Sequence, residues 1–257
     1  MLNVIAVPAF EDNYLWLMHE EGSAEAYVVD PGDSVPIEAA LKSNNLNLAG
    51  ILLTHHHWDH TGGVEALTSN RSIPVYGPDS ANIPQVTQQL KEGETLQLNK
   101  NLSFDIIAVP GHTLDHIAYH DGDSGSLFCG DALFAGGCGR MFEGQPAQMQ
   151  ASLAKLAALP SKTNIYCAHE YTQSNLRFAA VVEPDNIELR QRIAEVNNDR
   201  AAGRRTVPSV MADELTTNPF LRCSSDAVIA AAQAHQGKAL ATHAEVFAAL
   251  RQWKDNF

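Results

Sequence analysis

AGILLTHHHWDHTGG, residues 49–63, is the stretch of the chain that most restricts its fold. The apolar run at its start is typical of a buried strand, and the two glycines at its end indicate a turn. Because side chains alternate along an extended chain, His55 and His57 are expected to point to the same side. Asp59 and His60 can then reach a second point nearby. A strand that ends in this cluster predicts room for two metal ions.

Three further metal donors stand where other strands are expected to end. His112 follows a strand-like run and a Pro-Gly turn, Asp131 follows the run SLFCG, and His169 follows NIYCA. Ligands gather beyond strand ends in α/β sheets, so donors that are remote in sequence can converge in the fold. We expect these three side chains to complete the site.

The mixture of imidazole and carboxylate donors suits a divalent cation, most of all zinc, with iron or manganese as alternatives. Seven donors supply three for each of two ions and leave one carboxylate to bridge them. A purely structural metal site is expected to have four ligands and to be rich in cysteine.

An isolated histidine is more often a surface or capping residue than a ligand. We place in that class His56, which should point away from its neighbours, together with His19, His116, His120, His235 and His243.

The first two thirds of the chain consist of short apolar or alternating runs that are typical of strands. Helices are expected between some of these runs, over residues 36–42, 63–69 and 147–159. This alternation indicates a layered α/β core. The expected strands lie in VIAVPA, NYLWLMH, AYVVDPG, AGILLTHH, IPVYGP, LSFDIIAVPG, HIAYHD, SLFCGDALF and NIYCAHEY.

The chain becomes mainly helical from Pro184 onward. The segment DNIELRQRIAEVNNDRAAG ends in a glycine cap, and DAVIAAAQAHQG follows it. Thr242 and Glu245 have the spacing of a capping box at the start of the last helix. We therefore expect a layered domain over residues 1–171 and a small helical domain over residues 172–257.

The composition excludes one large class of partner. Seventeen basic and thirty acidic residues give a formal net charge of −13, which repels a phosphate backbone, so nucleic acid is not an expected partner. The N-terminal segment lacks a basic stretch and a small-residue cleavage site, and no apolar run approaches the roughly eighteen residues that span a bilayer. The four cysteines are sparse and show no C-x-x-C spacing, which favours reduced thiols. We expect a cytoplasmic protein that does not bind membranes.

The motifs T-H-x-H-x-D-H, G-H-T at 111–113, G-D-A at 130–132 and A-H-E at 168–170 resemble those of the metallo-β-lactamase superfamily. More closely, the chain resembles glyoxalase II, the hydroxyacylglutathione hydrolases, over nearly its full length. Residues 218–222, NPFLR, look like the C-terminal signature of that family, where they would shape the domain packing. The resemblance implies an αββα sandwich with a helical C-terminal domain. It also implies that His55, His57 and His112 hold one metal ion, that Asp59, His60 and His169 hold the other, and that Asp131 bridges them.

The resemblance implies hydrolysis of S-(2-hydroxyacyl)glutathione thioesters such as S-lactoylglutathione, the second step of methylglyoxal detoxification. Two cations roughly 3.5 to 4 Å apart lower the pKa of a bound water towards about 7. We hypothesise that the resulting hydroxide, oriented by Asp59, attacks the thioester carbonyl, and that the weakly basic thiolate leaves without a strong general acid. A covalent mechanism through Cys129, Cys138 or Cys167 is disfavoured, because their apolar or small neighbours are typical of buried cysteine.

Glutathione carries two carboxylates, so its binding site needs cations. Arg251 and Lys254 share a face of the last expected helix, although basic residues equally suit a solvated helix end. Glyoxalase II enzymes carry a similar R-x-x-K pair, and Tyr171 matches a tyrosine of the family. Their G-C-G-K-x-Y segment differs here, because Arg140 keeps the charge with another geometry and Phe142 lacks the hydroxyl. The resemblance therefore implies that Arg140, Tyr171, Arg251 and Lys254 bind the substrate.

Several other functions are compatible with the same motifs. A lactonase or a persulfide dioxygenase could use this scaffold, because a fold does not determine a function. Iron content and oxygen uptake would identify the dioxygenase, and a secreted β-lactamase should carry a signal peptide. Outside the enzymes, a metal-binding module without turnover would have no need of Asp59 beside the H-x-H pair. We expect a monomer whose partner is a small-molecule glutathione thioester.

Overall fold

The chain passes between two structural units, each of which combines distant parts of the sequence. The computed structural model describes all 257 residues. One unit contains residues 1–108 and 115–130, and the other contains residues 109–114 and 131–257. These units divide the chain differently from the expected domains, 1–171 and 172–257, which stay a prediction.

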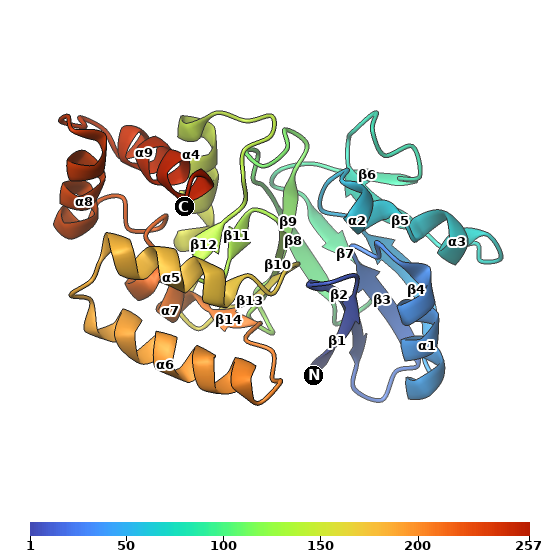
Figure 1. Cartoon of the computed structure of the whole chain (residues 1–257). Helices are drawn as coiled ribbons and strands as arrows, with labels where there is room; N and C mark the ends of the chain where they lie inside the picture. The colour runs from blue at the N-terminus through green and yellow to red at the C-terminus, as the bar shows by residue number, and fades with distance from the viewer. The chain divides into compact units, whose positions relative to one another are not determined.

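Six strands of the first unit form a mixed sheet in the order β1-β2-β3-β4-β5-β6. The first three strands are antiparallel, and β3 to β6 run parallel to one another. Helix α1, Ser34–Asn44, makes the crossover from β3 to β4, and its first turn is capped by the Asp33 side chain (Figure 1). The strands are β1 (Leu2–Ala9), β2 (Asn13–Glu20), β3 (Glu25–Val29), β4 (Asn47–Leu52), β5 (Val75–Pro78) and β6 (Gln88–Leu90).

Four antiparallel strands of the first unit follow in the order β10-β9-β8-β7. Tyr119 of β9 is fully buried, and its hydroxyl donates to the carbonyl oxygen of Leu53 at the end of β4 over 2.7 Å. This bond ties the second set of strands to the segment that carries the histidine cluster. The elements are β7 (Thr95–Gln97), β8 (Ser103–Ala108), β9 (Ile117–Asp121) and β10 (Ser126–Gly130), with the short helices α2 (Trp58–Thr61) and α3 (Val64–Thr68).

The second unit is mainly helical, and in Figure 1 α5 lies beside α6 and α8 beside α9. The capping box expected at Thr242 and Glu245 is present at the start of α9. None of its helices, nor any in the first unit, has the length and apolar character needed to cross a membrane. The helices are α4 (Pro146–Ala157), α5 (Thr172–Val182), α6 (Ile187–Ala201), α7 (Met211–Thr217), α8 (Asp226–Gln236) and α9 (His243–Asp255).

Two short pairs of strands complete the second unit. Strand β11, Leu133–Phe134, forms a hairpin with β12, Gly137–Cys138, and β13, Asn164–Cys167, pairs with β14, Ser209–Val210. The run SLFCGDALF was expected to be one strand but is divided into β10 and β11. The division falls at Gly130, whose positive φ of 46° turns the chain between them.

Candidate active site

The histidine cluster of the first unit is oriented by Asp30, which follows β3. The carboxylate of Asp30 accepts from the Thr54 backbone N–H over 2.7 Å and from the Thr54 hydroxyl over 2.7 Å. It also accepts from Nδ1 of His60 over 3.0 Å, while the Thr54 hydroxyl accepts from Nδ1 of His55 over 3.0 Å. A carboxylate behind an imidazole is the usual support of a metal-binding histidine, because it leaves Nε2 to face the ion.

The donor atoms of the first unit are spaced like ligands of a shared ion. Nε2 of His55 lies 3.1 Å from Nδ1 of His57, and Nε2 of His60 lies 3.4 Å from Oδ2 of Asp59. Two ligands of one tetrahedral zinc ion are separated by about 3.3 Å, given metal–ligand distances of about 2.0 to 2.1 Å. Asn13 steadies the Asp59 carboxylate by donating to Oδ2 over 3.0 Å. The four predicted ligands of this unit are therefore brought together in pairs.

The predicted ligands of the second unit are arranged around Asp131. Its Oδ2 lies 3.4 Å from Nε2 of His112, and its Oδ1 lies 3.4 Å from Nε2 of His169. These distances exceed the usual hydrogen-bond length and match the separation of two ligands on one ion. Nδ1 of His112 donates to the carbonyl oxygen of Arg140 over 2.8 Å, which directs Nε2 towards Asp131. A carboxylate that faces two imidazoles through different oxygens has the geometry of a bridging ligand.

Glycines allow the backbone to pack closely around this second group of donors. A Cβ atom added to Gly139 would lie 2.0 Å from the carbonyl oxygen of Asp131, and one added to Gly111 would lie 2.1 Å from the sulfur of Met149. The loop that follows Gly139 holds the His112 segment through a bond from the Phe142 N–H to the His112 carbonyl, 3.1 Å. A bulkier residue at Gly139 would press on Asp131 and His112, and one at Gly111 would press on Met149 of α4.

A cavity of about 570 Å³ in the second unit connects these donors with a group of cations. His112 and Asp131 line one part of it. All four residues predicted to bind the substrate also line it: Arg140, Tyr171, Arg251 and Lys254. The chemistry of its wall thus changes from metal donors to cations within one cavity.

The two basic residues of α9 differ in their surroundings. Arg251 is buried, where it donates to the Cys138 carbonyl over 3.0 Å and pairs with Asp255 over 2.9 Å. The pKa of Lys254 is lowered to about 8, first by burial and then by the charge of Arg251. Arg251 is therefore largely engaged by the protein, whereas the ammonium group of Lys254 is in an environment that favours an added anion.

Arg140 and Tyr171 lie at more open positions of the cavity. The Arg140 side chain is 64% exposed, and its Nε lies 3.4 Å from Asp255. Tyr171 stacks on the His169 ring with a centroid distance of 4.7 Å. Phe142 is 64% exposed, and its ring lies edge-on to the His112 ring with a centroid distance of 5.3 Å.

Sequence reasoning missed three cavity residues on α5, namely Ser174, Asn175 and Arg177. The helix itself was not expected. Arg177 could have been found as the one charged residue in TQSNLRFAAVV, three positions after Ser174 on the same helical face.

Two histidines outside the predicted ligand set also have defined roles in the packing. His56 turns from the cluster and donates through Nδ1 to Asp115 over 2.9 Å, in agreement with its exclusion from the ligand set. His116, which was expected to be a surface or capping residue, is buried and stacks on the His55 ring at 4.6 Å. It supports a predicted ligand from behind, a role that its isolated position in the sequence did not indicate.

All four cysteines are free thiols in buried positions. Burial raises the pKa of Cys138 and raises that of Cys167 to about 12. Neutral thiols are poor nucleophiles, which agrees with the prediction that none of them forms a covalent intermediate.

Comparison with known families divides the chain into two adjoining matches. Residues 13–169 match the metallo-beta-lactamase superfamily, and residues 170–257 match the hydroxyacylglutathione hydrolase C-terminus. The hydroxyacylglutathione hydrolase of Alkalilimnicola ehrlichii is 54% identical over 256 residues and covers 99% of both chains. That of Pseudomonas aeruginosa is 52% identical over 259 residues and covers 100% of both.

Solved structures with lower sequence identity share the fold of this chain. ETHE1 from Myxococcus xanthus has a TM-score of 0.67 at 22% identity, covering 98% of this chain and 91% of its own. The BLEG-1 B3 metallo-beta-lactamase has a TM-score of 0.63 at 23% identity, covering 86% of this chain and 99% of its own. Together with the two family matches, they confirm the expected metallo-β-lactamase-like α/β fold, and the C-terminal part of the chain is helical as expected. By full-length identity and by its C-terminal match, the chain belongs to the hydroxyacylglutathione hydrolases of the metallo-β-lactamase superfamily.

Proposed function

We propose that this protein hydrolyses S-(2-hydroxyacyl)glutathione thioesters, such as S-lactoylglutathione, to glutathione and a 2-hydroxy acid. The observation that carries the proposal is the cavity of the second unit, where His112 and Asp131 share a wall with Arg140 and Lys254. Metal donors are placed beside cations that suit a substrate with two carboxylates. The names of the relatives, hydroxyacylglutathione hydrolase, agree with this chemistry.

The donor set fits two divalent cations, and we propose zinc as the native metal. Both groups of donors contain imidazole and carboxylate at separations close to those of ligands on one ion. When bound, two such ions acidify a water molecule and polarise a carbonyl oxygen. The proposed ligands are His55, His57 and His112 for one ion, Asp59, His60 and His169 for the other, and Asp131 as the bridge.

The protein's own residues orient the reacting groups. Asn13 holds the Asp59 carboxylate, which in turn is proposed to orient the nucleophile. Asp30 fixes His60, and the Arg140 carbonyl fixes His112, so the donor atoms are directed before the substrate arrives. The leaving thiolate is a weak base, and the chain needs no separate general acid to release it.

The glutathione part is proposed to lie among the cations of the cavity. Lys254 and Arg140 would pair with carboxylates, while Tyr171 would contact the peptide part from its place beside His169. Arg251 would act mainly by fixing the Cys138 carbonyl and Asp255. We further propose that the protein is a cytoplasmic monomer.

The proposal is tested by a panel of thioesters with metal analysis. The rate of hydrolysis of S-lactoylglutathione and of the truncated S-lactoyl-N-acetylcysteamine would be measured with the purified protein before and after chelation. Its zinc, iron and manganese contents would also be measured. We expect about two metal ions per chain, loss of activity on chelation, and a kcat/KM for the glutathione thioester at least about 100-fold higher, since the truncated substrate lacks both charged ends. Full activity without metal, or equal kcat/KM on both substrates, would refute the proposal.

A further inference from the structure

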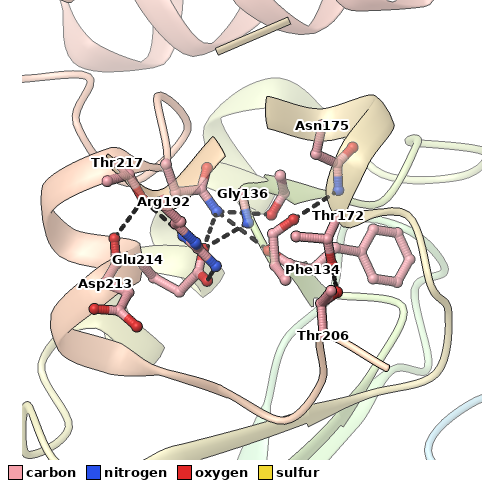
Figure 2. A network of polar contacts seen from close by, with 12 residues as sticks. Phe134, Gly136, Thr172, Asn175, Arg192, Thr206, Asp213, Glu214 and Thr217 are labelled. Atoms are coloured by element: carbon pink, nitrogen blue, oxygen red, sulfur yellow. Dashed lines mark hydrogen bonds and ion pairs between the residues drawn. The ribbon is translucent and has the colours of Figure 1, made fainter. Parts of the chain in front are cut away.

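The β11–β12 hairpin is held by side chains that bond its backbone at four consecutive residues, 134–137. The Asn218 side-chain amide donates to the carbonyl oxygens of Phe134 and Gly137 over 3.3 and 2.9 Å. The Asn175 amide donates to the Ala135 carbonyl over 3.0 Å. Between these carbonyl groups, the backbone N–H of Gly136 donates to the Glu214 carboxylate over 2.8 Å (Figure 2).

Glu214 is the centre of this arrangement and is fully buried. Besides the Gly136 N–H, its carboxylate accepts from the Asn218 amide over 3.0 Å and forms an ion pair with Arg192 of α6. Arg192 also donates to the Thr217 hydroxyl over 2.6 Å. Figure 2 shows Arg192 and Glu214 pointing towards each other and towards Gly136. We call Arg192, Glu214 and Asn218 the hairpin clamp.

The hairpin has little freedom to adopt another position against α5. A Cβ atom added to Gly136 would lie 2.7 Å from Leu176 of that helix, and one added to Gly137 would lie 2.6 Å from the Asn175 side chain. At Gly136 the positive φ of 70° also favours glycine. The clamp bonds and the close packing therefore restrict the position of the hairpin.

The hairpin connects the two chemical parts of the cavity. At its start, the Phe134 ring lies edge-on to His169 at 5.8 Å and to Tyr171 at 5.3 Å. At its end, the Cys138 carbonyl accepts from Arg251. A displaced hairpin would thus move Tyr171 and Arg251 together.

We propose that the hairpin clamp is a positioning device for glutathione recognition. None of its three residues lines the cavity, so they act through the hairpin and not by touching the substrate. This inference rests on the proposed function, because it assigns the clamp to the glutathione side of that cavity. It also gives a task to Asn218 of the NPFLR signature, for which the sequence suggested only domain packing.

The stability of the fold does not by itself account for a buried Arg–Glu pair. Replacing such a pair by apolar residues of similar volume is often neutral or stabilising, since desolvation offsets the attraction between the charges. What apolar residues cannot replace is the directional bond to the Gly136 N–H. Stability and substrate binding should therefore respond differently when the pair is replaced.

The first test replaces Glu214 and uses the Glu183–Arg222 pair as the control. Glu183 is buried, Arg222 is partly exposed, and the two pair over 2.8 Å. The side-chain hydrogen bonds of Arg222 go to Glu183 and to the Leu215 carbonyl, which lie outside the hairpin. We expect Glu214→Gln to raise the Kd for S-methylglutathione, measured by calorimetry, and the KM for S-lactoylglutathione about tenfold, with kcat within about threefold. Glu183→Gln should lower Tm to a similar degree and leave Kd and KM unchanged. Equal Kd values in the two variants would overturn the proposal.

The second test covers the case in which Glu214→Gln does not fold. The double variant Arg192→Met with Glu214→Leu removes both charges at nearly constant volume. We expect Tm to be equal to or above that of the wild type, a Kd for S-methylglutathione raised about tenfold, and faster hydrogen exchange at the Gly136 amide. Wild-type Kd in this stable variant would overturn the clamp proposal. Wild-type protein that fails to hydrolyse the thioester would instead overturn the proposed function, and the exchange at Gly136 and the binding data would still decide on the clamp.

Discussion

The donor cluster of the first unit and the cavity of the second unit are built in opposite ways. In the first, the predicted ligands His55, His57, Asp59 and His60 lie within six consecutive residues, and only their supports, Asp30, Asn13 and His116, come from elsewhere. In the second, the cavity is assembled from segments as distant as His112 and Lys254. A site made from one strand end depends on local chain geometry. A site made from many segments depends on the tertiary contacts that fix the positions of those segments.

The largest effect is expected at Asp131, because this one carboxylate faces both His112 and His169. Asp131→Asn keeps the shape of the side chain but replaces one oxygen that faces His112 or His169 by an N–H donor. We expect kcat to fall more than about 100-fold, since even residues that only support a ligand cost 10- to 100-fold. Metal analysis should show fewer than two ions per chain. Unchanged metal content with unchanged kcat would contradict a bridging role.

A smaller effect is expected when Asp30, which supports His60 in the first unit, is replaced. Asp30→Asn removes the charge behind His60 and weakens the bonds to Thr54, so metal affinity should fall roughly 10- to 100-fold. Competition with a chelator of known affinity measures the change. Asp121→Asn is the control, because Asp121 is also buried in this unit but bonds only to the turn after β9. Equal losses in both variants would mean that burial of the charge, and not ligand orientation, explains the result.

The smallest effect is expected in the pH dependence of ligand affinity at the cavity of the second unit. Lys254 has a pKa of about 8, so it is cationic below that pH and becomes neutral as the pH rises through it. A carboxylate binds the cation, so the affinity for S-methylglutathione should be full below pH 8 and fall several-fold towards pH 9. The titratable groups that act on Lys254 are Arg251, Arg177, Asp255 and Cys138.

Calorimetric titrations between pH 7 and pH 9 test this dependence. Lys254→Arg should make the affinity nearly independent of pH, because a guanidinium stays charged throughout this range. Lys155→Arg, on the exposed face of α4, is the matched control and should keep the wild-type profile. A wild-type profile in Lys254→Arg would show that another group titrates.

Eight of the nine expected strands form as single strands, and all the expected helices are present, because their hydrophobic period and caps act over a few residues. The sequence did not predict the helices α2, α5 and α7 or the short strands β6, β7, β12 and β14. Helix α7, Met211–Thr217, is short, and its buried Glu214 reads as a surface residue until Arg192 is brought next to it. The run SLFCGDALF looked like one strand because its apolar content continues through the turn at Gly130.

By itself the sequence determined the chemistry: seven metal donors of suitable types at strand ends, a helical C-terminal region, and basic residues on the face of its last helix. Local alternation and capping decide these features, and they act between near neighbours along the chain. Only the tertiary structure decided that Arg251 is engaged by Asp255 and Cys138, that Arg177 lines the cavity, and that Glu214 holds the β11–β12 hairpin. Burial and hydrogen bonding between remote segments depend on which surfaces meet, and no period in the sequence encodes that.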